Sequence, residues 1–190
     1  MAEYAGGASI GARIKAARRA RGFRTAKDLA DSIVGGKLTE AIIENIEAGR
    51  KADLSISQLF NIAMALKVPV SFLAAPMARI NAPLDLPNLS ADFDGMTSEQ
   101  FDGWISSTTS GAYRVEHNGE RNDRAELALL RELQTLTREQ HRLQVLLDLS
   151  EQSGSEVNNP LSSSTSTRLA DLVKQCAAIE AQLHNAGWKT

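Results

Sequence analysis

Short helices with marked ends are the feature of this sequence that most limits its fold. Three times in residues 9–49, a Ser or Thr able to cap a helix is followed within about a dozen residues by glycine. The pairs are Ser9 with Gly22, Thr25 with the glycines at 35–36, and Thr39 with Gly49. Apolar residues recur every three or four positions between these marks. We expect short helices at 10–21, 25–34, 39–48, 57–66 and 69–75, which pack into an all-α bundle.

Composition supports helices and limits the possible kinds of site. Aromatic residues make up only 5% of the chain, although 43% of the residues are hydrophobic. Cys176 is the only cysteine, so an intramolecular disulfide and a CxxC-type metal site are excluded. We find no apolar run of about 18 residues and no signal-peptide pattern. These features predict a soluble cytoplasmic protein without a membrane partner.

Charge is unevenly distributed along the chain. Residues 1–75 hold 11 Lys and Arg against 7 Asp and Glu, whereas the remainder is acidic. Such a basic region suits a polyanion, although a solvated helix face would have the same composition. Seven of its basic residues fall within fifteen positions: Arg13, Lys15, Arg18, Arg19, Arg21, Arg24 and Lys27.

A proline-containing segment separates the N-terminal helices from the rest. Residues 76–96 contain Pro76, Pro83 and Pro87, which interrupt any helical period. We expect a linker or an extended strap here. Four apolar side chains suggest that the segment packs on the bundle: Ile80, Leu84, Leu86 and Leu89.

The pattern over residues 97–190 predicts a mostly helical C-terminal domain. Thr97 and Gln100 have the spacing of a capping box, and Asn118-Gly119 is typical of a tight hairpin turn. A long helix is expected from about Asn122, then a polar loop at 153–167, then a last helix that ends at Gly187. Heptad-like spacing predicts that the two helices form an antiparallel hairpin, although the same seam is equally suited to dimerisation. The seam residues are Leu129, Leu133, Leu136, Gln140, Leu143 and Leu147 in the first helix, and Leu169, Leu172, Cys176, Ile179 and Leu183 in the last.

The N-terminal helices resemble the Cro/CI-type helix-turn-helix family, also called XRE, in the residues IGARIKAARRARGF, LADS and TEAIIENIEAGRKADLSISQLFNIAMALKVPVSFL. The resemblance covers about residues 9–73. It implies a five-helix, lambda-repressor-like DNA-binding domain over 1–75, whose third helix enters the major groove of double-stranded DNA.

The resemblance also implies roles for individual residues. Ile43 and Ile46 would brace the third helix from behind. The base-facing candidates are Glu40, Ala41, Glu44 and Asn45. Phosphate contacts would come from Arg24, Thr25, Lys27, Lys37, Thr39, Arg50 and Lys51. Arg18 and Glu47 match a pair of positions that form a structural ion pair in the family.

The sequence departs from the family pattern in two places. It has one extra residue near the start of the second helix, in RTAKDLA. The connection SIVGGKL is about three residues longer than the usual turn. The family pattern that assigns individual base contacts to the third helix has a turn of the usual, shorter length.

The C-terminal half has no recognisable catalytic arrangement. Self-cleaving repressors need a serine nucleophile and a lysine base, but residues 76–190 contain only Lys174 and Lys189. We expect no enzyme activity, cofactor, metal site or small-molecule ligand. His117, His141 and His184 are expected on the surface, and Trp104 and Trp188 in packing contacts.

Arginines recur every seven residues in the long helix and suggest a second DNA contact. A solvated coiled-coil face with nearby glutamates explains the same pattern. The residues that recur are Arg124, Arg131 and Arg138, with Arg142 one turn further on and Arg121 just before the helix.

The whole layout is similar to the immunity repressors of temperate actinobacterial phages, including mycobacterial ones. This resemblance implies transcriptional repression that maintains lysogeny, by a monomer on an asymmetric site or by a homodimer. One alternative is a host regulator or an antitoxin-like autorepressor with a protein-binding C-terminal half. Another is an interaction adaptor that does not bind DNA, since the third helix carries two acids.

Overall fold

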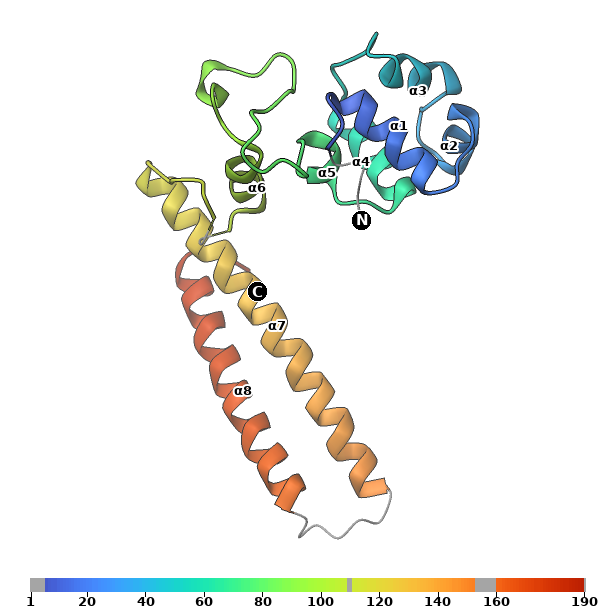
Figure 1. Cartoon of the computed structure of the whole chain (residues 1–190). Helices are drawn as coiled ribbons and strands as arrows, with labels where there is room; N and C mark the ends of the chain where they lie inside the picture. The colour runs from blue at the N-terminus through green and yellow to red at the C-terminus, as the bar shows by residue number, and fades with distance from the viewer. Residues whose placement is uncertain (1–5, 109–110, 153–159, 190) are drawn as a thin grey trace. The chain divides into compact units, whose positions relative to one another are not determined.

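The computed structural model describes residues 6–108, 111–152 and 160–189, and these residues form an all-α structure (Figure 1). The all-α class expected from the sequence is therefore confirmed. Within the described ranges the only β pairing is an isolated antiparallel bridge between Pro83 and Thr97. The helices are α1 (Ile10–Ala20), α2 (Ala26–Ser32), α3 (Glu40–Glu47), α4 (Ile56–Leu66), α5 (Val70–Ala74), the 3-10 helix η2 (Ala91–Phe93), α6 (Ser98–Ser106), α7 (Asn118–Gln152) and α8 (Pro160–Asn185).

The contacts between residues divide the chain into two compact units. The first unit comprises Met1–Ser106 and Ser110–Arg114, and the second comprises Ser107–Thr109 and Val115–Thr190. Helix α6 thus groups with the N-terminal helices, whereas the sequence-based ranges placed residues 97–106 with the C-terminal domain.

Helices α1 to α5 begin and end where local chemistry favours it. The side chains of Ser9, Thr25 and Thr39 cap α1, α2 and α3, as the sequence predicts. Helix α4 begins one residue earlier than expected because Ser55 caps it and forms a capping box with Gln58. The five helices share one apolar core, which includes the fully buried Ile14, Leu29, Ile43, Ile62, Leu66 and Leu73.

The segment after α5 is held to the bundle by both apolar and ionic contacts. Leu84 and Leu86 are half-buried against Ala74, Ala75 and Phe101, so the expected packing is confirmed for these two residues. Ile80 and Leu89 remain 53% and 39% exposed. The capping box expected for α6 is present, with Thr97 N–H donating to Gln100 Oε1 at 2.9 Å.

An ion pair that the sequence analysis did not foresee also joins this segment to α1. Arg13 is fully buried, and its Nη2 donates to Asp85 Oδ1 at 2.7 Å. The same guanidinium donates to the carbonyl oxygens of Gly7, Leu73 and Ala74. We call this set of bonds the Arg13 clasp.

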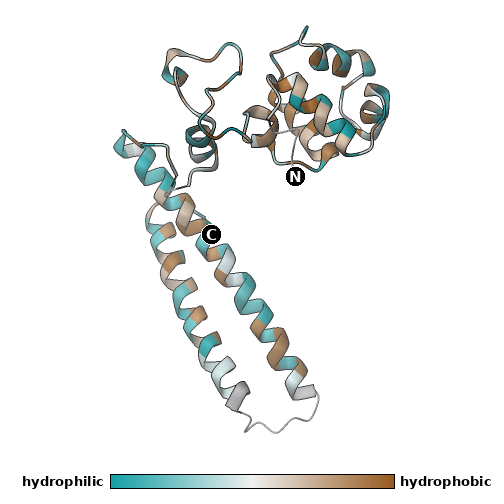
Figure 2. Cartoon of the chain, in the orientation of Figure 1, coloured by the Kyte–Doolittle hydropathy of each residue, from teal (hydrophilic) through white to brown (hydrophobic). Residues whose placement is uncertain are grey.

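Helices α7 and α8 form the antiparallel hairpin that the heptad spacing predicts (Figure 1). Leu133, Cys176, Ile179 and Leu183 are buried between the helices, and apolar positions alternate with polar ones along both of them (Figure 2). The indole of Trp188 packs on this cluster and donates to Glu126 Oε2 at 2.8 Å.

Two local predictions for the second unit are wrong. Asn118-Gly119 does not turn a hairpin but begins α7, four residues before the expected start. Helix α8 begins at Pro160, so residues 160–167 of the expected loop are helical. The rest of that loop, 153–159, lies outside the described residues. Ser, Thr and Asn have a weak helix preference, so their composition alone did not indicate these longer helices.

Candidate nucleic-acid interface

Helix α3 is a short helix with one face buried and one face exposed. Its eight residues span about 12 Å at 1.5 Å per residue. Thr39 Oγ1 accepts from Ile42 N–H at 3.4 Å at the start, and Gly49, with φ of +74°, follows the end. Ile43 and Ile46 are 0% and 1% exposed. The helix is therefore braced from behind, as the sequence predicts.

Helix α1 approaches the back of α3 with no side chain between the two backbones. A Cβ atom built on Gly11 would lie 3.0 Å from the carbonyl carbon of Ile46 and closer still to its oxygen. Only glycine permits this approach without a shift of the backbone. Gly11 therefore sets how closely α3 sits on the bundle.

The Arg18–Glu47 ion pair expected from the family resemblance is present. Arg18 Nε donates to Glu47 Oε1 at 2.6 Å, and Arg18 Nη2 donates to Oε2 at 2.9 Å. The two side chains are only 5% and 6% exposed. The hydrogen bond to Glu47 raises the pKa of Arg18 and outweighs the opposing effect of burial.

The remaining donors of Arg18 also bond within the protein. Its Nη1 donates to the carbonyl oxygens of Phe23 and Arg24, at 2.9 and 2.7 Å. The pair thus joins α1, the segment before α2 and the end of α3. It leaves Arg18 no direction from which to contact a ligand, so its role is structural.

The outer face of α3 carries the four side chains that the sequence predicts as base contacts. Glu40, Ala41 and Glu44 are exposed, and Asn45 is half-buried. Asn45 Oδ1 accepts from Arg50 Nε at 2.7 Å, a bond that sequence reasoning missed. Arg50 lies beyond the helix end, so only the turn at Gly49 brings the two together. The bond orients the amide and holds a guanidinium beside the outer face.

The start of α2 is less favourable to phosphate than the sequence suggests. Thr25 N–H donates to Asp28 Oδ2 at 2.8 Å, and Asp28 N–H donates to Thr25 Oγ1 at 3.1 Å. The hydrogen bond from the backbone N–H of Thr25 is the main cause that lowers the pKa of Asp28. A carboxylate therefore already occupies this helix start.

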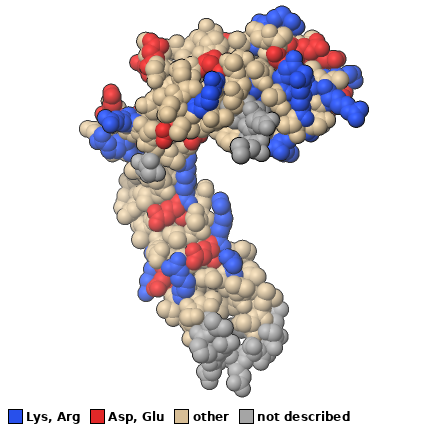
Figure 3. Space-filling view, viewed as in Figure 1, with Lys and Arg blue, Asp and Glu red and all other residues tan. Residues whose placement is uncertain are grey.

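The other predicted phosphate-contact residues are distributed around α2 and α3. Lys27 pairs with Asp31 at 3.0 Å, and its pKa is raised chiefly by that hydrogen bond. The side chains of Arg24, Lys37, Thr39 and Arg50 are exposed, and Lys51 is half-buried. Lys and Arg lie among a few acidic residues on the visible face of this part of the unit (Figure 3).

The basic cluster of residues 13–27 is not one surface patch. Arg13 and Arg18 are 0% and 4% exposed and act as internal ties. Arg19, Arg21 and Arg24 are exposed, and Lys15 is half-buried. Because an α-helix repeats every 3.6 residues, some of several consecutive charged side chains must face the core. Their partners, Asp85 and Glu47, are far away in the sequence, so the sequence alone does not show which charges these are.

The long connection between α2 and α3 is anchored at both ends. Ile33 and Leu38 are 9% and 6% exposed, whereas Val34 between them is 95% exposed. Gly35 has φ of +76°, and a Cβ on Gly36 would lie 2.6 Å from Ile33 Cγ2. The additional residues thus form an exposed loop between two residues, Ile33 and Leu38, that are buried in the core.

The arginines of α7 do not form one continuous stripe. Arg124 is 5% exposed and pairs with Glu120 at 2.8 Å. Arg121 donates to Asn118 Oδ1 at 3.0 Å and to the carbonyl oxygen of Val115. Arg131, Arg138 and Arg142 are exposed.

Two of the exposed arginines share a hollow on α7. Arg138 and Arg142 line this hollow of about 500 Å³ together with Glu139 and Leu143. A carboxylate is thus part of the same surface. Any anion contact on α7 is limited to its four exposed arginines, of which Arg121 already bonds within the chain.

The described residues contain no group of three or more His, Cys, Asp or Glu side chains placed to hold a metal ion. Within the same ranges, no helix combines the length and apolar character needed to cross a membrane.

Comparison with protein-family models, curated proteins and solved structures gives no match.

Proposed function

We propose that this chain is a sequence-specific DNA-binding transcriptional repressor of the Cro/CI-type helix-turn-helix family. In this proposal α3 reads the major groove, and the protein is a phage immunity repressor that maintains lysogeny in the cytoplasm. The observation that carries the proposal is the way in which α3 is held on the helical bundle with one face exposed. Helix α3 is capped, braced by Ile43 and Ile46 and fixed by the Arg18–Glu47 pair. An α-helix with its side chains is about 10–12 Å across, which fits a major groove about 12 Å wide.

The side chains on the outer face have the chemistry to distinguish base pairs. Asn45 can donate through its amide nitrogen while Arg50 holds its oxygen. Glu40 and Glu44 can accept from the amino group of cytosine, and Ala41 can contact a thymine methyl. Arg24, Lys37, Arg50 and Lys51 supply phosphate contacts, and Arg131, Arg138 and Arg142 of α7 are candidates for a second contact.

Selection of binding sites from random DNA duplexes by the purified full-length chain tests the proposal. We expect one enriched motif, and we expect Asn45→Ala to relax the base preference at one position of it. Asn122→Ala, an exposed asparagine on α7, is the matched control and should leave the motif unchanged. Affinity should fall steeply as salt rises, because phosphate contacts release counterions.

The acidic outer face of α3 supports one other function, an adaptor that binds protein and not DNA. Glu40 and Glu44 are both exposed there and repel phosphate. If the selection enriches no motif even at low salt, the repressor proposal fails and the adaptor is favoured.

A further inference from the structure

The chain around η2 and α6 carries acidic residues and no basic ones. From position 80 to position 113 there is no Lys, Arg or His, and the charge comes from Asp85, Asp92, Asp94, Glu99 and Asp102. Asp85 is neutralised by Arg13. Asp92, Asp94 and Glu99 are exposed, and Asp102 is half-buried. These four carboxylates form no ion pair with any residue that the structure describes, so they are available to a partner.

The same part of the chain exposes apolar side chains. Trp104 and Ile105, near the end of α6, are 37% and 46% exposed. The indole of Trp104 stands edge-on to the ring of Phe93, with ring centroids 5.3 Å apart, and its centroid lies 6.0 Å from that of Phe101. Phe101 is buried against Ala74 and Ala75, so these rings rest on the core of the first unit. We call Phe93, Trp104 and Ile105 the α6 patch.

Carboxylates border the α6 patch on two sides. Asp92 and Asp94 directly flank Phe93 in the sequence, in η2 and at its end. Asp102 precedes Ile105 by three residues on α6, so the two are neighbours on the helix surface. An aromatic surface bordered by acids complements a chain that carries both apolar and cationic side chains. The acids attract Lys and Arg, and the face of an indole also attracts a cation.

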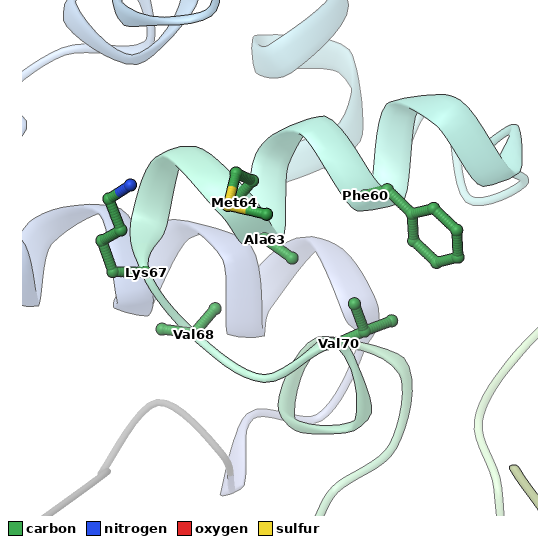
Figure 4. A pocket seen from close by; sticks show the side chains of 6 residues that line it. All are labelled: Phe60, Ala63, Met64, Lys67, Val68 and Val70. Carbon is green, nitrogen blue, oxygen red and sulfur yellow. The ribbon is translucent and has the colours of Figure 1, made fainter. Parts of the chain in front are cut away.

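A second apolar surface of the same unit lacks this acidic border. A hollow of about 350 Å³ beside α4 is lined by Phe60 and Met64, together with Val68 and Val70 from the chain that follows (Figure 4). Among the described residues that line it, Lys67 alone is charged. A cationic partner is therefore attracted to the α6 patch and not to the α4 hollow, which makes the hollow a suitable control.

We propose that the α6 patch and its bordering acids are a docking surface for a partner protein that presents a basic, amphipathic segment. Large apolar side chains of that segment would cover Trp104 and Ile105, and its Lys or Arg side chains would pair with Asp92, Asp94 and Asp102. Nucleic acid does not suit this surface, because the same acids repel phosphate. The proposal goes beyond DNA reading by α3 and does not depend on it.

Selection from a library of random 12-residue peptides by the purified full-length chain tests the docking surface. We expect the enriched peptides to combine Lys or Arg with large apolar residues. Asp92→Asn together with Asp94→Asn should weaken their binding by roughly threefold to tenfold, and Trp104→Ala by about tenfold or more. Added salt should also weaken binding, because it screens exposed charges.

Two matched variants separate the α6 patch from other surfaces. Asp123→Asn together with Asp171→Asn removes two exposed acids from the second unit, and Phe60→Ala removes an exposed ring from the α4 hollow. Neither should change the affinity for the enriched peptides. Circular dichroism checks the fold of each variant.

Asp92 and Asp94 are exposed, so their conversion to Asn should retain the fold even where Trp104→Ala does not. The charge comparison therefore stands alone as a test. The proposal is overturned if no peptide is enriched, if the enriched peptides are not basic, or if the variant with both Asn residues binds them as tightly as the wild type.

Discussion

Gly11 and Arg18 are the two residues of α1 that determine where α3 lies. Gly11 sets the distance between the two helix backbones, and Arg18 fixes the far end of α3 through Glu47. Both act from behind the exposed face. The position of the candidate DNA-reading helix therefore depends on residues that would touch no DNA.

Gly11→Ala should destabilise the first unit by about 1–3 kcal/mol, because the new methyl group overlaps the backbone of α3. Urea unfolding measures the change. Gly119→Ala is the control, since its Cβ meets only the movable ring of His117, at 3.3 Å. Equal effects of the two substitutions would show that the close approach is not limiting.

Arg18→Met should cost about 3–5 kcal/mol, because it leaves the carboxylate of Glu47 buried without its partner. Lys27→Met removes one member of an exposed pair, whose side chains are 63% and 66% exposed, and should have a far smaller effect because water screens such a pair. Thermal unfolding of the two variants gives the comparison. A small loss for Arg18→Met would contradict the structural role of the pair.

The residue scale also shows where sequence reasoning is limited. The Arg18–Glu47 pair could be expected because both positions fall within the family pattern. The Arg13–Asp85 pair could not, since its members are 72 positions apart and Arg13 stands in a run of apparently exposed basic residues. The Asn45–Arg50 bond depends on the turn at Gly49, which sequence spacing does not describe.

At the scale of elements, caps and glycines marked the ends of α1, α2 and α3 well, because these signals act locally. They failed for α7 and α8, where Asn118 and the Ser/Thr-rich start of α8 have weak helix preference.

The capping box of α2 makes the stability of the folded chain dependent on pH. The pKa of Asp28 is lowered from its ordinary value of 3.8 in the folded chain, so its stabilising effect is complete above that value. The effect is lost as the pH falls through the lowered folded-state pKa. We expect Asp28→Asn to be less stable than wild type at pH 6, and we expect the difference to become smaller at pH 2. Parallel urea titrations at the two pH values measure this, and a constant difference would contradict it.

The segment after α5 is part of the first unit because of the Arg13 clasp. Asp85→Ala should lower the stability of this unit by about 3–5 kcal/mol, since the fully buried Arg13 then lacks its counter-charge. Asp92→Ala, an exposed acid of the same segment, is the control. Denaturant unfolding of both variants tests whether the segment is a structural strap or only a linker.

At the scale of the whole molecule, the two units have separate apolar cores. Ile14, Leu29 and Ile43 belong to one, and Leu133 and Leu183 belong to the other. The existence of a helical bundle and a helical hairpin could be predicted from apolar spacing. Their boundary could not, because residues 76–96 have no helical period, and the short helix α6 after them carries no sequence signal that assigns it to either unit.

Leu183→Ala should destabilise the hairpin by about 2–5 kcal/mol, because it leaves a cavity at a fully buried position. Hydrogen exchange should become faster in α7 and α8 and stay unchanged in α1 to α5. Leu149→Ala, at a leucine that is 56% exposed, should change neither. Faster exchange in both units would show that they unfold together.

The Arg13 clasp also limits how the sequence can change over evolutionary time. All three guanidinium nitrogens of Arg13 donate within the fold, so lysine, with its single nitrogen, cannot replace it. The half-buried Lys15 and the exposed Arg19 have no such requirement. Among descendants of this sequence, positions 13 and 85 should therefore be kept or replaced together, while the neighbouring basic positions exchange Lys and Arg freely.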